Sequence, residues 1–152
     1  MNEMRVTTNN PEQTMVLAAR IGSKLRGGEC IQLSSDVGGG KTTFTRGLVK
    51  GAGSDDHVSS PTFTISKVYR AEKFSIVHFD FYRLDEPGLI AHELEEVGDD
   101  PTNVIVVEWS DIVEHVLPEE LLKIEIRSKG ENDREIIITS PARYKYLMEG
   151  IA

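Results

Sequence analysis

The stretch Ser-Asp-Val-Gly-Gly-Gly-Lys-Thr (residues 35–42) joins a short apolar segment, Cys30 to Leu33, to a run in which Phe44 and Leu48 recur at helical spacing. A strand, a glycine-rich turn and a helix are therefore predicted in that order. The turn matches the pattern G-x-x-x-x-G-K-[ST], with serine in place of the first glycine. Consecutive glycines let backbone amides converge on an anion, and the start of the helix adds its positive dipole end. A turn that only caps a helix needs no lysine and threonine directly after it, so this stretch predicts a phosphate-binding loop.

The side chains around the glycines have distinct predicted tasks. The ammonium group of Lys41 can reach the β and γ phosphates of a nucleotide, and the hydroxyl of Thr42 can bind magnesium. Ser35 leaves both side chains where they are needed, provided that its backbone avoids the region that only glycine adopts freely. The residues expected to contact the nucleotide are Asp36, Val37, Gly38, Gly39, Gly40, Lys41, Thr42 and Thr43.

Two acidic residues stand at the ends of predicted strands. Glu108 directly follows the apolar run 104–107, and Asp80 ends a β-rich run that begins at Phe74. Enzymes with a phosphate loop need such a carboxylate, because the cation that bridges the phosphates requires a second anchor. An acid after a strand is also common as a helix cap or a solvated loop residue. The residues alone leave both interpretations open.

The remaining patterns predict a mixed α/β sandwich that forms one domain over residues 1–152. Asn10 is the expected N-cap of a helix whose apolar positions run from Thr14 to Leu25. The other expected elements are strands 30–33 and 103–108, helices 41–50, 89–97 and 110–116, hairpins 67–70/74–80 and 121–127/134–139, and a C-terminal helix from Ser140-Pro141. We expect parallel strands in the core of the sheet and antiparallel hairpins at its edges.

The composition indicates a soluble cytoplasmic protein. The chain has 152 residues, of which 39% are hydrophobic and 28% charged, as in one ordinary globular domain. No apolar run approaches the roughly 20 residues that cross a bilayer, so no membrane attachment is expected. The single cysteine, Cys30, rules out an internal disulfide and suits a reducing compartment. Because the formal net charge of −8 opposes direct binding to nucleic acid, another protein is expected to hold any RNA.

Four segments occur in the order found in one known family: SSDVGGGKTTF (34–44), SPTFT (60–64), HFDFYRL (78–84) and VEW (107–109). Together they resemble the TsaE family, and the resemblance covers essentially the whole chain. It implies the magnesium-dependent P-loop ATPase of bacterial tRNA threonylcarbamoyladenosine biosynthesis. Such a protein acts with TsaD and TsaB proteins on adenosine 37 of tRNA and does not itself transfer the threonylcarbamoyl group. We expect slow ATP hydrolysis by the protein alone and stimulation by its partners.

The resemblance also implies roles for individual residues. These are Lys41 and Asp80 for catalysis, Thr42 and Glu108 for magnesium, and Thr62 and Trp109 for switching and sensitivity to partners. Aromatic and arginine residues are favoured as interface anchors, so Trp109 and the segment Phe81 to Arg83 are expected to form or support a docking face. Packing in the core is the alternative for these aromatic residues.

Three other classes of protein compete with an ATPase. A small-molecule kinase also has a phosphate loop, but it usually needs a substrate-binding lid for which 152 residues leave little room. A GTPase is disfavoured because no N-K-x-D sequence is present to recognise guanine. A nucleotide-dependent binding module without catalysis differs from an ATPase in releasing no phosphate.

Overall fold

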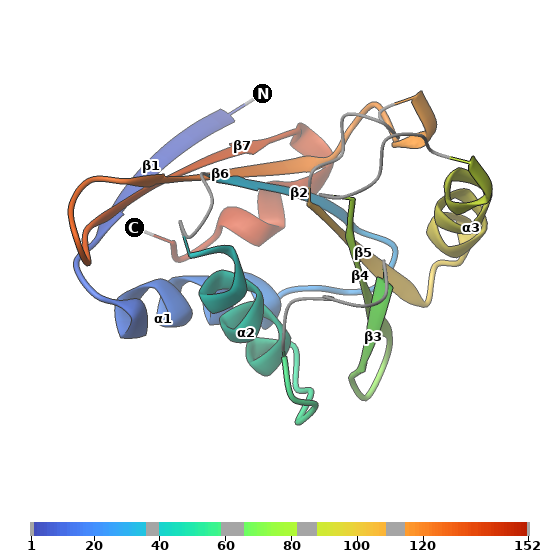
Figure 1. Ribbon diagram of the computed structural model, residues 1–152, viewed down its shortest axis with the longest axis horizontal. Coiled ribbons are helices and arrows are strands. Elements are labelled where there is room, and N and C mark those ends of the chain that lie inside the picture. Colours follow the sequence, from blue (N-terminus) through green and yellow to red (C-terminus); the bar gives the residue numbers. More distant parts are fainter. Residues whose placement is uncertain (1, 36–39, 59–65, 82–87, 109–114, 152) are drawn as a thin grey trace.

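The computed structural model describes residues 2–35, 40–58, 66–81, 88–108 and 115–151, and within them a seven-stranded mixed sheet carries helices on both faces (Figure 1). The strand order is β1-β7-β6-β2-β5-β4-β3. The strands are β1 (Asn2–Thr8), β2 (Cys30–Ser35), β3 (Ser66–Arg70), β4 (Ser75–Asp80), β5 (Asn103–Glu108), β6 (Leu122–Ser128) and β7 (Arg134–Ser140). The helices are α1 (Pro11–Gly22), α2 (Lys41–Gly51), α3 (Gly88–Asp99) and the 3-10 helix η2 (Ala142–Met148).

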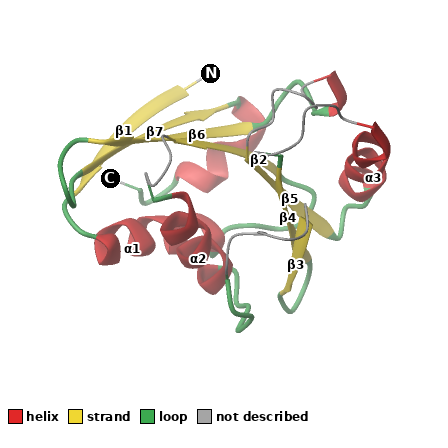
Figure 2. Ribbon diagram, in the orientation of Figure 1, coloured by secondary structure: helices red, strands yellow, loops and turns green. Residues whose placement is uncertain are grey.

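Four neighbouring strands in the middle of the sheet, β6, β2, β5 and β4, run parallel (Figure 2). At one edge β3 pairs antiparallel with β4, and at the other edge β7 and β1 add two antiparallel strands. The predicted sheet with a parallel core and antiparallel edge hairpins is therefore confirmed. Strand β5 is buried from Val104 to Glu108, as its continuous apolar sequence predicts.

The helices divide between the two faces of the sheet. Helices α1, α2 and η2 cover one face, and α3 covers the other (Figure 1). Because side chains alternate along a strand, each face has its own apolar cluster. Phe44 and Leu48 of α2 pack with Val106 of β5 on the first face, whereas Leu94 of α3 packs with Val107 on the second. Burial on both faces fixes β5, and with it the position of the residue that ends this strand.

Small residues let α1 and α2 cross in close contact. A Cβ added to Gly47 would lie 2.5 Å from the carbonyl oxygen of Met15, and one added to Gly51 would lie 2.2 Å from that of Ala19. Both distances are far shorter than a normal van der Waals contact, so any larger residue would push the two helices apart. The close contact holds the axis of α2, and therefore the position of Lys41 in its first turn.

The predicted start of α1 is confirmed, whereas its predicted end is wrong. Asn10 Oδ1 accepts a hydrogen bond from the backbone N–H of Gln13 at 2.8 Å, as expected for an N-cap. The Gln13 side chain accepts from the backbone N–H of Asn9 at 2.7 Å, one residue before the position used in a capping box. The helix ends at Gly22, and Leu25 is buried in the turn that follows.

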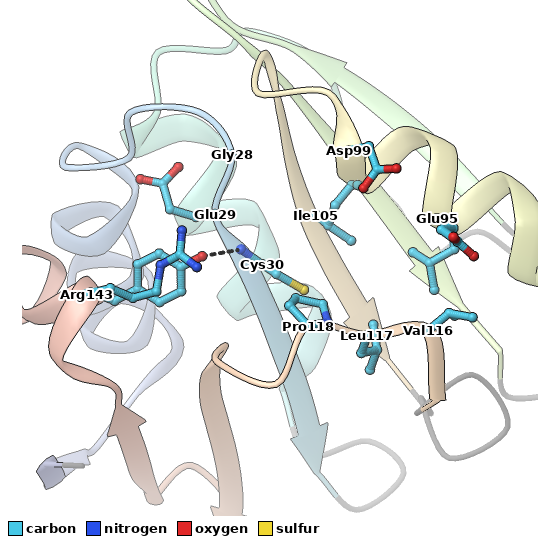
Figure 3. Close-up of a pocket in the computed structure, with 13 residues that line it drawn as sticks. Gly28, Glu29, Cys30, Glu95, Asp99, Ile105, Val116, Leu117, Pro118 and Arg143 are labelled. Atoms are coloured by element: carbon cyan, nitrogen blue, oxygen red, sulfur yellow. Dashed lines mark hydrogen bonds between the residues drawn. The ribbon is translucent and has the colours of Figure 1, made fainter.

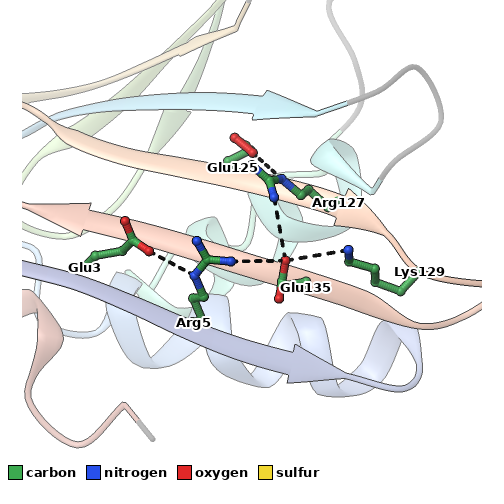
Figure 4. Close-up of polar contacts among 6 residues, drawn as sticks. All are labelled: Glu3, Arg5, Glu125, Arg127, Lys129 and Glu135. Carbon is green, nitrogen blue, oxygen red and sulfur yellow. Dashed lines mark hydrogen bonds and ion pairs between the residues drawn. The ribbon is translucent and has the colours of Figure 1, made fainter.

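The sequence analysis did not predict β1. Met4 and Val6 of this strand pack against the core on the face of α1, and charged residues alternate with them. On the opposite face, Arg5 and Lys129 each place a nitrogen 3.8 Å from the same carboxylate oxygen of Glu135 in β7 (Figure 4). Charges on an edge strand discourage pairing with a second chain. The strand thus closes the sheet with a polar surface.

The C-terminal helix begins after Pro141 as predicted, but it is a 3-10 helix. Tyr144 interrupts it with φ −107°, and its side chain and that of Leu147 are buried in the core. Residues 110–114 of the expected helix 110–116 lie outside the described residues. Among the helices that the structure describes, none has the length and apolarity needed to cross a membrane.

Candidate functional site

Three parallel strands end together at one edge of the sheet. Strand β2 ends at Ser35, β4 at Asp80 and β5 at Glu108, and the last two residues lie opposite each other in the ladder. Helix α2 begins at Lys41, six positions after the end of β2. Ligands of open α/β sheets bind at the carboxyl ends of such strands. The topology therefore brings three of the predicted site residues to this edge.

Glu108 is the centre of the polar contacts at this edge. The residue is 4% exposed, and its Oε1 lies 3.7 Å from the Nζ of Lys41. Its Oε2 is hydrogen-bonded to the Nε2 of His78. A buried carboxylate needs such partners, because water no longer solvates its charge. The predicted lysine and the predicted acid are thus in contact, and the contact includes a histidine to which the sequence analysis gave no role.

The first turn of α2 has no side-chain cap. Its N-cap is Gly40, with φ 106°, and the carbonyl oxygen of this residue accepts a hydrogen bond from Phe44 N at 2.9 Å. Left-handed backbone favours glycine, so the last glycine of the motif is required by geometry. The first turn contains no acidic residue. A helix start with lysine and without a competing carboxylate in its own turn is suited to an anion.

Ser35 occupies strand backbone. It is the last residue of β2 and pairs with Ile126 of the parallel strand β6. Extended backbone is open to every residue type, so this position does not require glycine. The condition that the sequence analysis set for serine is met.

A small pocket of about 40 Å³ adjoins the start of α2. It is lined by Pro11, Thr14, Gly40, Thr43, Asn132 and Arg134. Asn132 lies in the turn between β6 and β7, and Arg134 is the first residue of β7. Both are distant from the glycine loop in the sequence, and sequence reasoning missed them. Arg134 Nη1 donates to the carbonyl oxygens of Gly130 and Asp133 at 3.1 and 2.9 Å, which orders this turn beside the loop.

Several predicted residues lie outside the described residues: Asp36, Val37, Gly38, Gly39, Thr62, Trp109 and the Tyr82-Arg83 part of the expected docking face. For Phe81, the remaining residue of that face, the prediction of an exposed docking residue is wrong. Phe81 is 2% exposed and stacks on Phe79, with ring centroids 5.8 Å apart. It belongs to the core because the chain leaves β4 on the face covered by α3.

A second pocket, of about 300 Å³, contains none of the predicted site residues (Figure 3). It lies near the start of β2, between α3, η2 and the segment 116–118. Cys30 lies in its lining, and burial raises the pKa of the thiol to about 12. A thiol with so high a pKa is not a nucleophile at neutral pH. Cys30 therefore supplies no reactive thiol to this pocket at neutral pH.

The fold and this edge define a mixed α/β protein in which the helix after a central parallel strand starts with a lysine facing a buried glutamate. The family model described as "Threonylcarbamoyl adenosine biosynthesis protein TsaE" matches residues 8–136. The chain belongs to the TsaE family.

The relatives are similar over most of their length. The tRNA threonylcarbamoyladenosine biosynthesis protein TsaE of Bacillus subtilis is 36% identical over an alignment that covers 100% of this chain and 96% of the relative. The protein of the same name from Streptomyces coelicolor is 39% identical, with 79% and 83% covered. The crystal structure of Bacillus subtilis YdiB superposes with a TM-score of 0.80 at 34% identity, covering 99% of this chain and 94% of that one.

Proposed function

We propose that this protein binds and hydrolyses ATP in support of tRNA threonylcarbamoyladenosine formation. It would act in the cytoplasm with TsaD and TsaB proteins, which hold the tRNA and transfer the threonylcarbamoyl group. The observation that carries the proposal is the contact between Lys41 and the buried Glu108 at the start of α2. Burying an ion pair costs desolvation that an apolar pair of similar size would not. Its position beside a glycine-rich loop therefore favours binding of a charged ligand over a purely structural role.

The nucleotide phosphates would be held by residues 36–43, with Lys41 as the principal cation. Its Nζ lies 3.7 Å from Glu108, whereas a charge-assisted hydrogen bond is about 2.7 to 2.9 Å long. The ammonium group can turn toward a phosphate without breaking a tight hydrogen bond to this carboxylate. Lys41 would then neutralise charge that builds up on the transferred phosphoryl group, which is its catalytic role.

The oxygen donors at this edge fit magnesium. The ion prefers oxygen ligands in octahedral geometry, and it commonly uses one or two carboxylates together with phosphates and waters. Glu108 offers one carboxylate and Thr42 a hydroxyl in the first turn of α2. Among the described residues, no three His, Cys, Asp or Glu side chains gather in a group that could bind a metal. We therefore expect the nucleotide phosphates to supply part of the magnesium ligands. Bound magnesium would neutralise the phosphate oxygens during hydrolysis.

Asp80 would orient the attacking water. It stands opposite Glu108 in the ladder. As the last residue of β4, it lies at the same edge of the sheet as Ser35, the last residue of β2 before α2. Thr62 and Trp109 complete the proposal as the switch and the residue sensitive to partners.

Calorimetry tests nucleotide binding. Wild type is expected to bind ATP with magnesium, and Lys41→Ala is expected to lose most of the affinity because the phosphates lose their counter-ion. Lys50→Ala is a matched control, since Lys50 is an exposed lysine of the same helix. Equal affinity in wild type and Lys41→Ala would overturn the assignment.

Turnover tests the functional context. Phosphate release is measured for the protein alone, with purified TsaD and TsaB homologues, and with tRNA added. We expect a low rate alone and a higher rate with the partners, because a partner that closes the site excludes bulk water around the attacking molecule and completes the catalytic groups. Binding without hydrolysis under every condition would leave a nucleotide-dependent binding module instead.

A further inference from the structure

His78 is a buried histidine to which the proposed reaction gives no role. It lies in β4, is 1% exposed and stands two residues before Asp80 on the same face of the strand. In the ladder it is opposite Val106, so Glu108 is its diagonal neighbour on β5. That register lets the imidazole reach along the sheet toward the carboxyl edge, where its Nε2 meets Glu108 Oε2.

The hydrogen bond assigns the tautomer of His78. An ionised carboxylate only accepts hydrogen bonds, so the Nε2 of His78 carries the hydrogen and donates it to Glu108. The other ring nitrogen, Nδ1, is buried and has no hydrogen-bond partner among the described residues. A buried N–H without a partner costs more free energy than a ring nitrogen that accepts no hydrogen bond. Neutral imidazole carries only one hydrogen, so Nδ1 can remain without one. The tautomer with hydrogen on Nε2 satisfies both observations.

The neighbours of His78 hold its ring in place. The ring of Tyr69, which is fully buried in β3, lies with its centroid 6.2 Å from that of the imidazole at an interplanar angle of 35°. On the other side, β5 is fixed by burial on both faces of the sheet. A donor confined between β3 and β5 can hold one carboxylate oxygen in a constant position.

We propose that His78 is a positioning residue for Glu108, an inference that rests on the proposed function. By holding Oε2, His78 turns Oε1 toward Lys41 and the start of α2, where the phosphates and magnesium would bind. Partners that orient a metal-binding carboxylate typically change metal affinity or activity 10- to 100-fold when they are removed. If His78 only filled space in the core, its hydrogen bond would not matter and leucine could take its place without affecting magnesium binding.

The test measures how magnesium changes ATP affinity in His78→Leu and His78→Gln. The leucine variant keeps apolar bulk and loses the donor, so the half-saturating magnesium concentration is expected to rise roughly 10-fold or more. The glutamine variant retains an N–H donor at a similar reach and is expected to recover most of the loss. ATP affinity in the presence of a chelator is expected to stay at the wild-type value, because Lys41 and the loop are unchanged. His92→Leu is the control, since His92 is an exposed histidine of α3.

A second measurement does not depend on the folding of a variant. Long-range ¹H–¹⁵N spectra of the wild-type protein are expected to show a hydrogen on the Nε2 of His78. Hydrogen on Nδ1 with none on Nε2 would overturn the inference, as would a leucine variant with wild-type magnesium dependence. In either case magnesium-dependent ATP binding by wild type would leave the proposed function standing. A wild-type protein whose ATP affinity ignores magnesium would overturn the proposed function, and the inference with it.

Discussion

Asp80 and Glu108 lie opposite each other as the last residues of two neighbouring parallel strands, yet their surroundings differ. Glu108 is buried and contacts Lys41 and His78, whereas Asp80 is only half-buried. Adjacent carboxylates repel each other unless a cation compensates them. The contact with Lys41 favours Glu108 for the proposed metal site, and the partial exposure of Asp80 suits its proposed role with water. The two acids should therefore respond differently to neutralisation.

Asp80→Asn is expected to separate binding from chemistry. Because the carboxylate would orient the attacking water, turnover should fall roughly 100-fold while ATP affinity stays within about threefold of wild type. Glu108→Gln should instead weaken the dependence of ATP binding on magnesium. Calorimetry and phosphate release, measured on both variants, distinguish these effects. If Asp80→Asn lost as much ATP affinity as turnover, Asp80 would contribute to ATP binding and not only to the chemical step.

Ser35→Gly tests the departure from the glycine-loop pattern. Ser35 has strand backbone beside Ile126, so glycine relieves no strain there, and ATP affinity is expected to remain within about twofold of wild type. Glycine within a strand should lower the free energy of unfolding by about 0.5 to 1 kcal/mol. Calorimetry and urea unfolding measure the two quantities. A marked loss of ATP binding would assign the serine hydroxyl a role of its own.

The strand–loop–helix unit was predictable because its information is local. Glycines followed by lysine and threonine, between an apolar strand and an apolar helical pattern, require no knowledge of the rest of the chain. Glu108 and Asp80 could be predicted as candidates for a similar reason, since each ends an apolar run. Their adjacency follows only once β4 and β5 are known to be neighbours in parallel register.

The missed features depend on pairings between distant segments. Strand β1 has few apolar residues, and its structure depends on pairing with β7 at the far end of the chain. The contact of His78 with Glu108 is diagonal across two strands, so no spacing within the sequence indicates it. Arg134, the first residue of β7, lies beside Gly40 because of the strand order. In each case the contact depends on the tertiary fold, and the periodicity of the sequence carries no information about it.

The thiol of Cys30 provides a pH-dependent test of burial. Burial raises its pKa from 9.0 to about 12, because the thiolate would lose its solvation. Above pH 9 the unfolded chain loses this proton first, so the folded protein binds more protons and the free energy of unfolding falls as pH rises toward 12. The free energy of unfolding of Cys30→Ala, measured by urea titration, should fall less steeply with pH over the same range. Identical slopes, or rapid reaction of the native thiol with a thiol reagent, would contradict this description of the site.

The crossing of α1 and α2 links core packing to the position of Lys41. Gly47→Ala would place a methyl group 2.5 Å from the carbonyl oxygen of Met15, and the forced separation is expected to cost about 1 to 3 kcal/mol of unfolding free energy. Gly98→Ala is the matched control, because its Cβ would meet no atom within 4 Å and alanine favours the helix α3 by up to about 1 kcal/mol. Since α2 carries Lys41 and Thr42 in its first turn, ATP affinity should fall in Gly47→Ala and stay unchanged in Gly98→Ala. Urea unfolding and calorimetry measure both effects. A stable Gly47→Ala protein with wild-type affinity would show that the helix contact does not set the position of the site.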